Sequence, residues 1–159
     1  MAFTILCVGK ARERFYADAV AEYRKRLSAL VPCEIVEVPD EPEPKQLSGA
    51  AMEQVKHTEG ERLLSRIPSG AYVFALCVDA KQPTSEELAA KIQSLFNAGR
   101  SDLYFVIGGS LGLHDNVLRR ADEKLGLSRL TFPHQLARAI LAEQLYRAVK
   151  INAGQRYHK

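Results

Sequence analysis

The chain has 159 residues, of which 47% are hydrophobic and 26% are charged, so we expect one compact globular domain covering residues 1–159. Its first residues, MAFTILCVGK, form an apolar run with no basic segment before it, and no later run is long enough to span a bilayer. We therefore expect neither a secretion signal nor a membrane segment. The formal net charge of +3 permits binding to a polyanion but does not by itself indicate it.

The three cysteines, Cys7, Cys33 and Cys77, each lie in an apolar stretch typical of a strand. They form no CxxC pair and no Cys/His cluster with the spacing of metal ligands. We interpret them as reduced core residues, which favours a cytoplasmic protein without a metal centre.

The patterns along the chain alternate between strand and helix and end with a short helix, a strand and a long helix. This alternation predicts an α/β fold with a mostly parallel sheet flanked by helices. Near-continuous apolar runs are typical of strands that are buried on both faces. The expected strands cover residues 4–9, 33–38, 72–78, 103–108 and 127–132.

Helix signals and a loop signal lie between these strands. Apolar residues three and four positions apart, from Tyr16 to Leu30, predict a packing helix. Residues 39–44 combine prolines with acids, which predicts a loop. A third helix begins near residues 85–87, where acids lie at its positive end, and Gly99 ends it.

Three glycines, Gly108, Gly109 and Gly112, directly follow the fourth expected strand. Such a segment exposes backbone N–H groups and lets a ligand approach closely, but an isolated GGxxG is more often a tight turn between a strand and a helix. The dinucleotide-binding fingerprint belongs after the first strand of its unit, with an acid about twenty residues later. This glycine segment does not match it.

The last expected helix, from Pro133 to Val149, has two apolar faces. Ala137, Leu141 and Leu145 share one side, whereas Leu136 and Ile140 lie well away from them. One face can cover the sheet, and we expect the other to pack against a second subunit. The alternative is that another helix of the same chain covers it. Thr131 is a possible cap for this helix.

The polar side chains of this helix can be explained by ordinary helix structure as well as by a function. His134 is expected to face solvent or its own backbone. Arg138 lies in the apolar arc, so it either reaches an acid or phosphate of a partner or extends to the surface. Glu143 and Arg147 are four residues apart, as in a helical ion pair.

The chain ends with the polar segment GQRYHK, and such tails are usually disordered and dispensable. Arg156, Tyr157, His158 and Lys159 nevertheless combine phosphate contacts, a stacking ring and a group that titrates near neutrality. A tail that covers an active site would use all three.

Several segments together resemble the SPOUT-class methyltransferases that methylate N3 of a pseudouridine in large-subunit ribosomal RNA, the RlmH family. The similarity covers essentially the whole chain in the right order. The matching segments are TILCVGK at 4–10, EVPDE at 37–41, EGERLL at 59–64, FVIGGSLGL at 105–113, LSRLTFPHQLARAILAEQLYRA at 127–148 and the terminal YHK.

The resemblance implies an α/β fold whose C-terminal part forms a trefoil knot, and a homodimer packed through the last helices. It also implies S-adenosylmethionine as the methyl donor, bound in the knot without a metal. The donor-binding positions implied by the family are Leu76, Gly108, Leu127, Ser128, Arg129, Leu130, Thr131 and Phe132.

For the proton on N3 of the acceptor, our hypothesis assigns His158, assisted by Tyr157, with solvent as the alternative acceptor. Arg138 and Arg147 would orient the donor loop or the RNA backbone across the dimer. The family suggests the assembled ribosome as substrate, which fits the small net charge.

Two other functions remain open from the residues. One is a ribosome-associated binding protein that has kept the fold but lost catalysis. The other is a nucleotide-dependent oxidoreductase, which only the α/β pattern and the glycines suggest.

Overall fold

The computed structural model describes residues 1–43, 46 and 48–158, and its elements alternate in the predicted order. None of the helices in these ranges is long and apolar enough to cross a membrane. The elements are β1 (Ala2–Val8), α1 (Arg14–Ser28), β2 (Cys33–Val38), α2 (Gly49–Leu64), β3 (Tyr72–Leu76), α3 (Ser85–Asn97), β4 (Asp102–Ile107), α4 (Asp115–Arg120), β5 (Glu123–Leu125) and α5 (His134–Asn152).

The strands form one five-stranded sheet in the order β2-β1-β4-β3-β5, and every neighbouring pair is parallel. This confirms the predicted α/β class. The central strands β1 and β4 pair in register, for example Leu6 with Val106. Because all the strands run in one direction, their carboxyl ends lie along a single edge of the sheet, where α/β proteins bind ligands.

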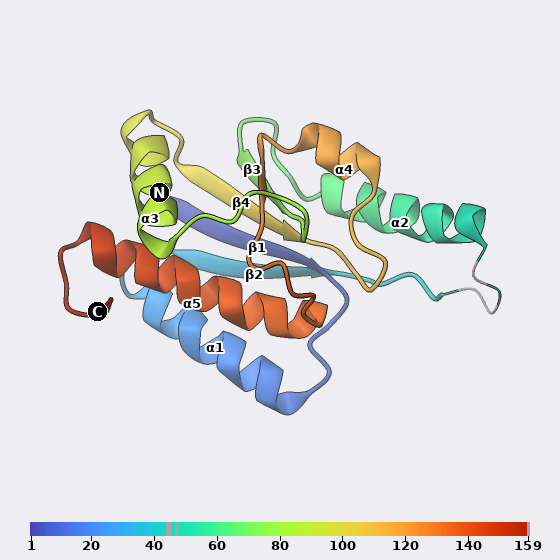
Figure 1. Cartoon of the computed structure of the whole chain (residues 1–159), viewed down its shortest axis with the longest axis horizontal. Coiled ribbons are helices and arrows are strands. Elements are labelled where there is room, and N and C mark those ends of the chain that lie inside the picture. The colour runs from blue at the N-terminus through green and yellow to red at the C-terminus, as the bar shows by residue number, and fades with distance from the viewer. Residues whose placement is uncertain (44–45, 47, 159) are drawn as a thin grey trace.

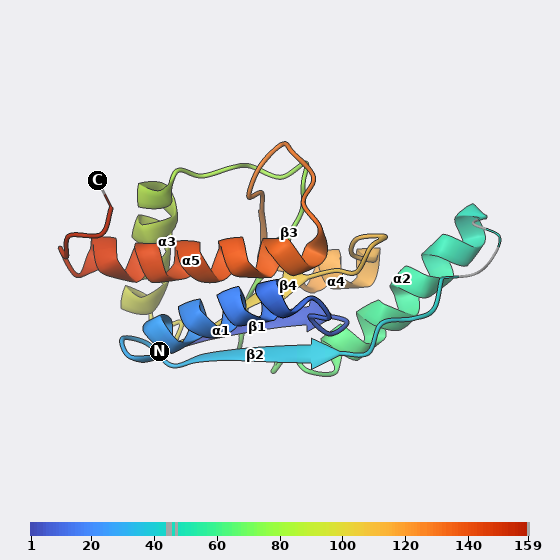
Figure 2. The same cartoon turned by 90° about the horizontal axis from the view of Figure 1, so that it is seen from below.

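Alternation along β1 divides the core into two layers of side chains. Phe3, Ile5 and Cys7 belong to the cluster that includes residues of α1, α3 and α5, whereas Leu6 and Val8 join residues of α2 and α4. Figure 1 shows α1 and α5 side by side and α2 beside α4 in another part of the molecule, and Figure 2 shows the same grouping from below. The sheet is thus the middle of three layers.

The prediction of a fifth strand over residues 127–132 is wrong. The strand is shorter and lies earlier, at Glu123–Leu125, and residues 127–132 form a loop. The apolar residues of this loop face a cavity, so their pattern imitates that of a buried strand. The Gly126 N–H donates to the Lys81 carbonyl, so the segment packs against the loop after β3.

The start of α5 also differs from the prediction. The residue at its N-cap is Pro133, with no side-chain cap, so Thr131 does not cap the helix. By contrast, α3 begins as predicted, with Thr84 and Glu87 forming a reciprocal capping box. Gly99 ends it with a φ of +77°.

Helix α5 has one fully buried side and one that is only partly covered. Leu141, Leu145 and Ala148 are completely buried in the core. Leu136 and Ile140 remain half-buried although α1 and α3 both contact the helix. Helices of the same chain therefore cover α5 in part and leave an apolar stripe that water reaches.

Arg138 is the largest fully buried side chain in the described part of the chain, with 0% exposure. Its Nη1 donates to Glu37 Oε1 at 2.9 Å, and its Nη2 donates to the carbonyls of Val8 at 2.6 Å and Gly9 at 2.9 Å. Nε has no hydrogen-bond partner among the described residues. The guanidinium thus joins the start of α5 to the carboxyl ends of β1 and β2.

We expect Arg138→Met to lower the free energy of unfolding by about 3 kcal/mol, because it leaves Glu37 and two backbone carbonyls without their buried cation. Urea denaturation followed by circular dichroism measures the change. The exposed Arg24 of α1 provides the control, since Arg24→Met should cost less than about 0.5 kcal/mol. Equal effects of the two substitutions would contradict the role of Arg138.

Candidate functional site

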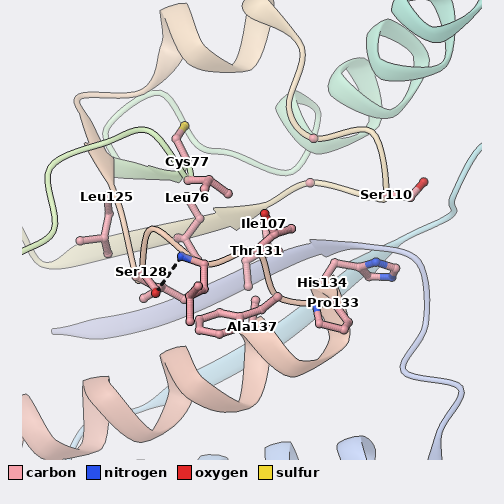
Figure 3. A pocket seen from close by; sticks show the side chains of 17 residues that line it. Leu76, Cys77, Ile107, Ser110, Leu125, Ser128, Thr131, Pro133, His134 and Ala137 are labelled. Carbon is pink, nitrogen blue, oxygen red and sulfur yellow. Dashed lines mark hydrogen bonds between the residues drawn. The ribbon is translucent and has the colours of Figure 1, made fainter.

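A cavity of about 540 Å³ opens at the carboxyl edge of the sheet (Figure 3), and its volume is in the range of small-molecule sites. Three backbone segments form it: the end of β3, the glycine segment after β4 and the loop that leads into α5. The lining residues are Leu76, Cys77, Val78, Ile107, Gly108, Gly109, Ser110, Gly112, Leu125, Leu127, Ser128, Leu130, Thr131, Phe132, Pro133, His134 and Ala137.

This cavity brings together most of the positions that the family resemblance implied. The residues Leu76, Gly108, Leu127, Ser128, Leu130, Thr131 and Phe132 all line it. Arg129 does not, because its position in the loop is exposed and lines a neighbouring hollow with Asp79 and Gln82. An arginine at that place can contact the outer rim of a ligand but not its buried part.

The lining suits a flat, neutral ring with polar edges. Leucine and phenylalanine side chains supply apolar walls, and the loop backbone supplies hydrogen-bonding groups. The loop is folded back on itself, since the Leu130 N–H donates to Ser128 Oγ at 3.0 Å, the bond drawn in Figure 3. Leu130 is nevertheless 71% exposed, so one wall of the cavity is open to solvent or to a partner.

Gly108 shows that the glycine segment is both a tight turn and a wall of the cavity. A Cβ on Gly108 would lie 2.7 Å from the carbonyl carbon and oxygen of Gly112 and 3.0 Å from the nitrogen of Leu113. These are backbone atoms that cannot move independently. Gly112 has a φ of +84°, which glycine adopts readily. The glycine segment can therefore be both a tight turn and part of a ligand site.

Among the lining residues that the sequence did not predict, two carry side chains that can react or titrate. His134 is half-buried in the cavity wall and not in solvent, and burial followed by the charge of Arg138 lowers its pKa, so its neutral form is favoured. Cys77 was interpreted as a core residue, yet it too lines the cavity. The one signal for His134 was its position in the first turn after the loop.

A smaller cavity of about 130 Å³ adjoins the first and shares Gly109, Ser110 and His134 with it. Its other walls are acidic and come from Asp40, Glu41, Glu43 and Glu59. These acids come from the predicted 39–44 loop, whose last residue, Pro44, lies outside the described residues, and from α2. From the sequence these segments were interpreted only as a loop and as family motifs, and not as part of a site.

Glu59 is the buried member of this group, with 5% exposure. Its Oε1 accepts a hydrogen bond from the Glu41 N–H at 3.0 Å. Burial raises the pKa of Glu59, and the backbone hydrogen bond opposes that rise. A carboxylate held at this place costs folding energy, which is typical of groups retained for function.

The C-terminal tail folds back on its own α5 and α3. Tyr157 donates to Glu143 Oε1 at 3.1 Å, and the two ring nitrogens of His158 lie 3.3 Å from Arg147 Nη1 and 2.6 Å from Glu86 Oε1. Lys159 lies outside the described residues. Burial and the bond to Glu143 raise the pKa of Tyr157 to about 12, so the phenol stays protonated and acts as a donor.

The tail is distant from the cavity of its own chain. Arg147, its contact on α5, follows the lining residue Ala137 by ten residues, which is about 15 Å of helix. Arg138 does not line the cavity either, because its guanidinium is directed to Glu37 and β1. The structure thus gathers the implied donor-binding residues but places the proposed catalytic residues elsewhere.

The chain matches known proteins over its whole length. Residues 1–158 match the family model described as "Predicted SPOUT methyltransferase". The chain is 52% identical to a Listeria monocytogenes protein and 51% identical to one from Lactiplantibacillus plantarum, over 159 residues and 100% of both chains in each case. Both relatives carry the name ribosomal RNA large subunit methyltransferase H. With its parallel sheet and loop-lined cavity, this chain belongs to the SPOUT methyltransferase family.

Proposed function

We propose that this chain transfers a methyl group from S-adenosylmethionine to large-subunit ribosomal RNA in the cytoplasm. The observation that carries the proposal is the cavity between the loops after β3, after β4 and before α5. The names of the full-length relatives support ribosomal RNA as the substrate. Following the resemblance, we assign the reaction to N3 of a pseudouridine.

The residues of the cavity fit the proposed donor. Adenine needs an apolar slot with hydrogen bonds at its edge, and residues 127–132 offer both. S-adenosylmethionine supplies a methyl group on a positively charged sulfur, and its transfer to nitrogen leaves a neutral thioether and releases the N3 proton. The contribution of the protein is to hold both partners at near-attack distance.

We propose a homodimer that pairs α5 of one chain with α5 of the other. The half-buried stripe with Leu136 and Ile140 is an apolar surface that its own chain leaves incomplete. With the two-fold axis across α5 the helices run antiparallel, so the C-terminal half of one helix lies beside the N-terminal half of its partner. The tail of one chain then reaches the cavity of the other.

In this arrangement His158 accepts the N3 proton, and Tyr157, whose hydroxyl donates to Glu143, offers its ring as a stacking surface for the acceptor base. Arg147 holds both, since its guanidinium contacts His158 and lies 4.7 Å from the centre of the Tyr157 ring. Arg138 serves as a positioning residue through β1. A net charge of +3 supports docking on an assembled ribosome.

Gly108→Ala should disrupt the donor cavity, because its Cβ would meet the backbone of Gly112. We expect it to lower the free energy of unfolding by about 1–3 kcal/mol. The shifted loop should also weaken S-adenosylmethionine binding about tenfold or more, measured by isothermal titration. Gly70→Ala is the matched control, since no atom lies within 4 Å of its added Cβ. Normal binding by Gly108→Ala would show that this loop does not form the donor site.

His158→Ala should lower the rate of methyl transfer about 100-fold, the usual contribution of a general base, and leave donor binding unchanged. The measurement follows labelled methyl groups from S-adenosylmethionine into assembled ribosomes and into free ribosomal RNA, and we expect the wild type to prefer ribosomes. A normal rate for the variant would remove the proposed base. Failure of the wild type to label either substrate would overturn the proposed function.

The dimer is tested by Ile140→Asp, which places a carboxylate in the α5 stripe. We expect the wild type to sediment as a dimer and the variant as a folded monomer, as judged by ultracentrifugation and circular dichroism. Leu30→Asp, at a 42% exposed residue after α1, is the control and should leave the dimer intact. A wild-type monomer at micromolar concentration would contradict the proposal.

A further inference from the structure

We propose that Glu59 makes the donor site selective for a positively charged ligand. The site would then bind S-adenosylmethionine, whose sulfur is positive, more tightly than the product S-adenosylhomocysteine, whose sulfur is neutral. This inference rests on the proposed function and concerns the ligand specificity of the same site. Glu59 acts as a specificity-determining residue because its buried carboxylate lies in the small acidic cavity next to the donor cavity.

The carboxylate of Glu59 is held against the glycine segment. A Cβ on Gly109 would lie 2.9 Å from Oε2 and 3.2 Å from Oε1, so the carboxylate fits only because this residue has no side chain. Oε1 accepts the Glu41 N–H, whereas Oε2 has no hydrogen-bond partner among residues 1–43, 46 and 48–158. A side chain with only 5% exposure thus contributes its carboxylate to the wall of the acidic cavity.

The two cavities meet at the end where the donor's sulfur is expected. Figure 3 shows Ser110 and His134 at the end of the donor cavity opposite Leu125 and Ser128. Ser110 and His134 also line the acidic cavity. With the adenine among the leucines at the opposite end, the donor's sulfur would lie toward Ser110, His134 and the carboxylates beyond them.

The charges around the acidic cavity do not cancel. Asp40 pairs with Arg12 at 3.3 Å, and Glu41 forms an ion pair with Arg62. Glu43 accepts a hydrogen bond from the Ser110 hydroxyl, and His134 favours its neutral form because burial lowers its pKa. No cation forms an ion pair with Glu59 in the described part of the chain. Burial raises the pKa of Glu59 and the charge of Arg62 opposes that rise, but that guanidinium is paired with Glu41. A buried, unpaired carboxylate attracts a nearby positive sulfur more strongly than a solvated one does.

Other occupants fit this cavity less well. Carboxylates repel phosphates, so the RNA backbone does not enter it. The described residues contain no group of three or more His, Cys, Asp or Glu side chains arranged to hold a metal ion. A singly charged organic cation that arrives through the adjoining donor cavity matches both its charge and its position.

The test is isothermal titration of the full-length protein with S-adenosylmethionine and with S-adenosylhomocysteine. We expect the wild type to bind the charged donor about tenfold more tightly than the product. Glu59→Gln should weaken the binding of S-adenosylmethionine alone and so bring the ratio of the two affinities close to one. Sinefungin, which carries an amine in place of the sulfonium, should follow the donor.

Glu61→Gln is the matched control, because Glu61 lies on the same helix with a 61% exposed side chain and contacts Asn116 and His57 instead. It should keep the wild-type ratio. In Glu59→Gln, the amide oxygen of the new side chain can still accept the Glu41 N–H. In the wild type, burial raises the pKa of Glu59, so the ionised carboxylate present above that pKa destabilises the folded state. The melting temperature of Glu59→Gln at neutral pH should therefore equal or exceed that of the wild type.

The outcomes separate this inference from the proposed function. Equal affinity of the wild type for donor and product, or an unchanged ratio in Glu59→Gln, overturns the inference and leaves the methyltransferase intact. Tighter donor binding with Mg²⁺ than with EDTA would also overturn it, because a metal would then occupy the acidic cavity. Binding of neither compound by the wild type would instead contradict the proposed donor.

Discussion

The buried guanidinium of Arg138 is the contact on which the geometry of this molecule depends. It fixes the first turns of α5 to the carboxyl ends of β1 and β2 through Glu37 and the carbonyls of Val8 and Gly9. The donor loop ends immediately before α5, so the position of that loop follows from the position of the helix. A side chain that does not line the cavity thereby influences its shape.

The sequence was sufficient for the class of fold because apolar runs in β1 and β4 have a single interpretation as strands that are buried on both faces. It failed at residues 127–132 because Leu127, Leu130 and Phe132 are apolar for a different reason, namely to line a cavity. A pattern of hydrophobicity cannot distinguish a side chain buried by protein from one reserved for a ligand. The error therefore fell on the segment that lines the candidate site.

The candidate site, too, could be predicted from the sequence only in part. The resemblance implied the donor-binding positions, most of which belong to the contiguous motifs at 105–113 and 127–148, and all but Arg129 line the cavity. His134 and Glu59 could not be found from local patterns, since each becomes significant only when α2, β4 and α5 meet in space. The placement of Tyr157 and His158 on their own α5 could not be foreseen either, because tails carry no periodic signal.

The separation of tail and cavity explains why pairing of chains and catalysis belong together in the proposed function. About 15 Å of helix separates the tail contacts from the cavity within one chain, so under the proposed function a lone subunit would hold the donor without its proton acceptor. Antiparallel pairing of α5 removes that separation without any change in either chain. In the proposed homodimer, the half-buried apolar stripe of α5 would then also bring tail and cavity together, which is a physical reason for two subunits to share one active site.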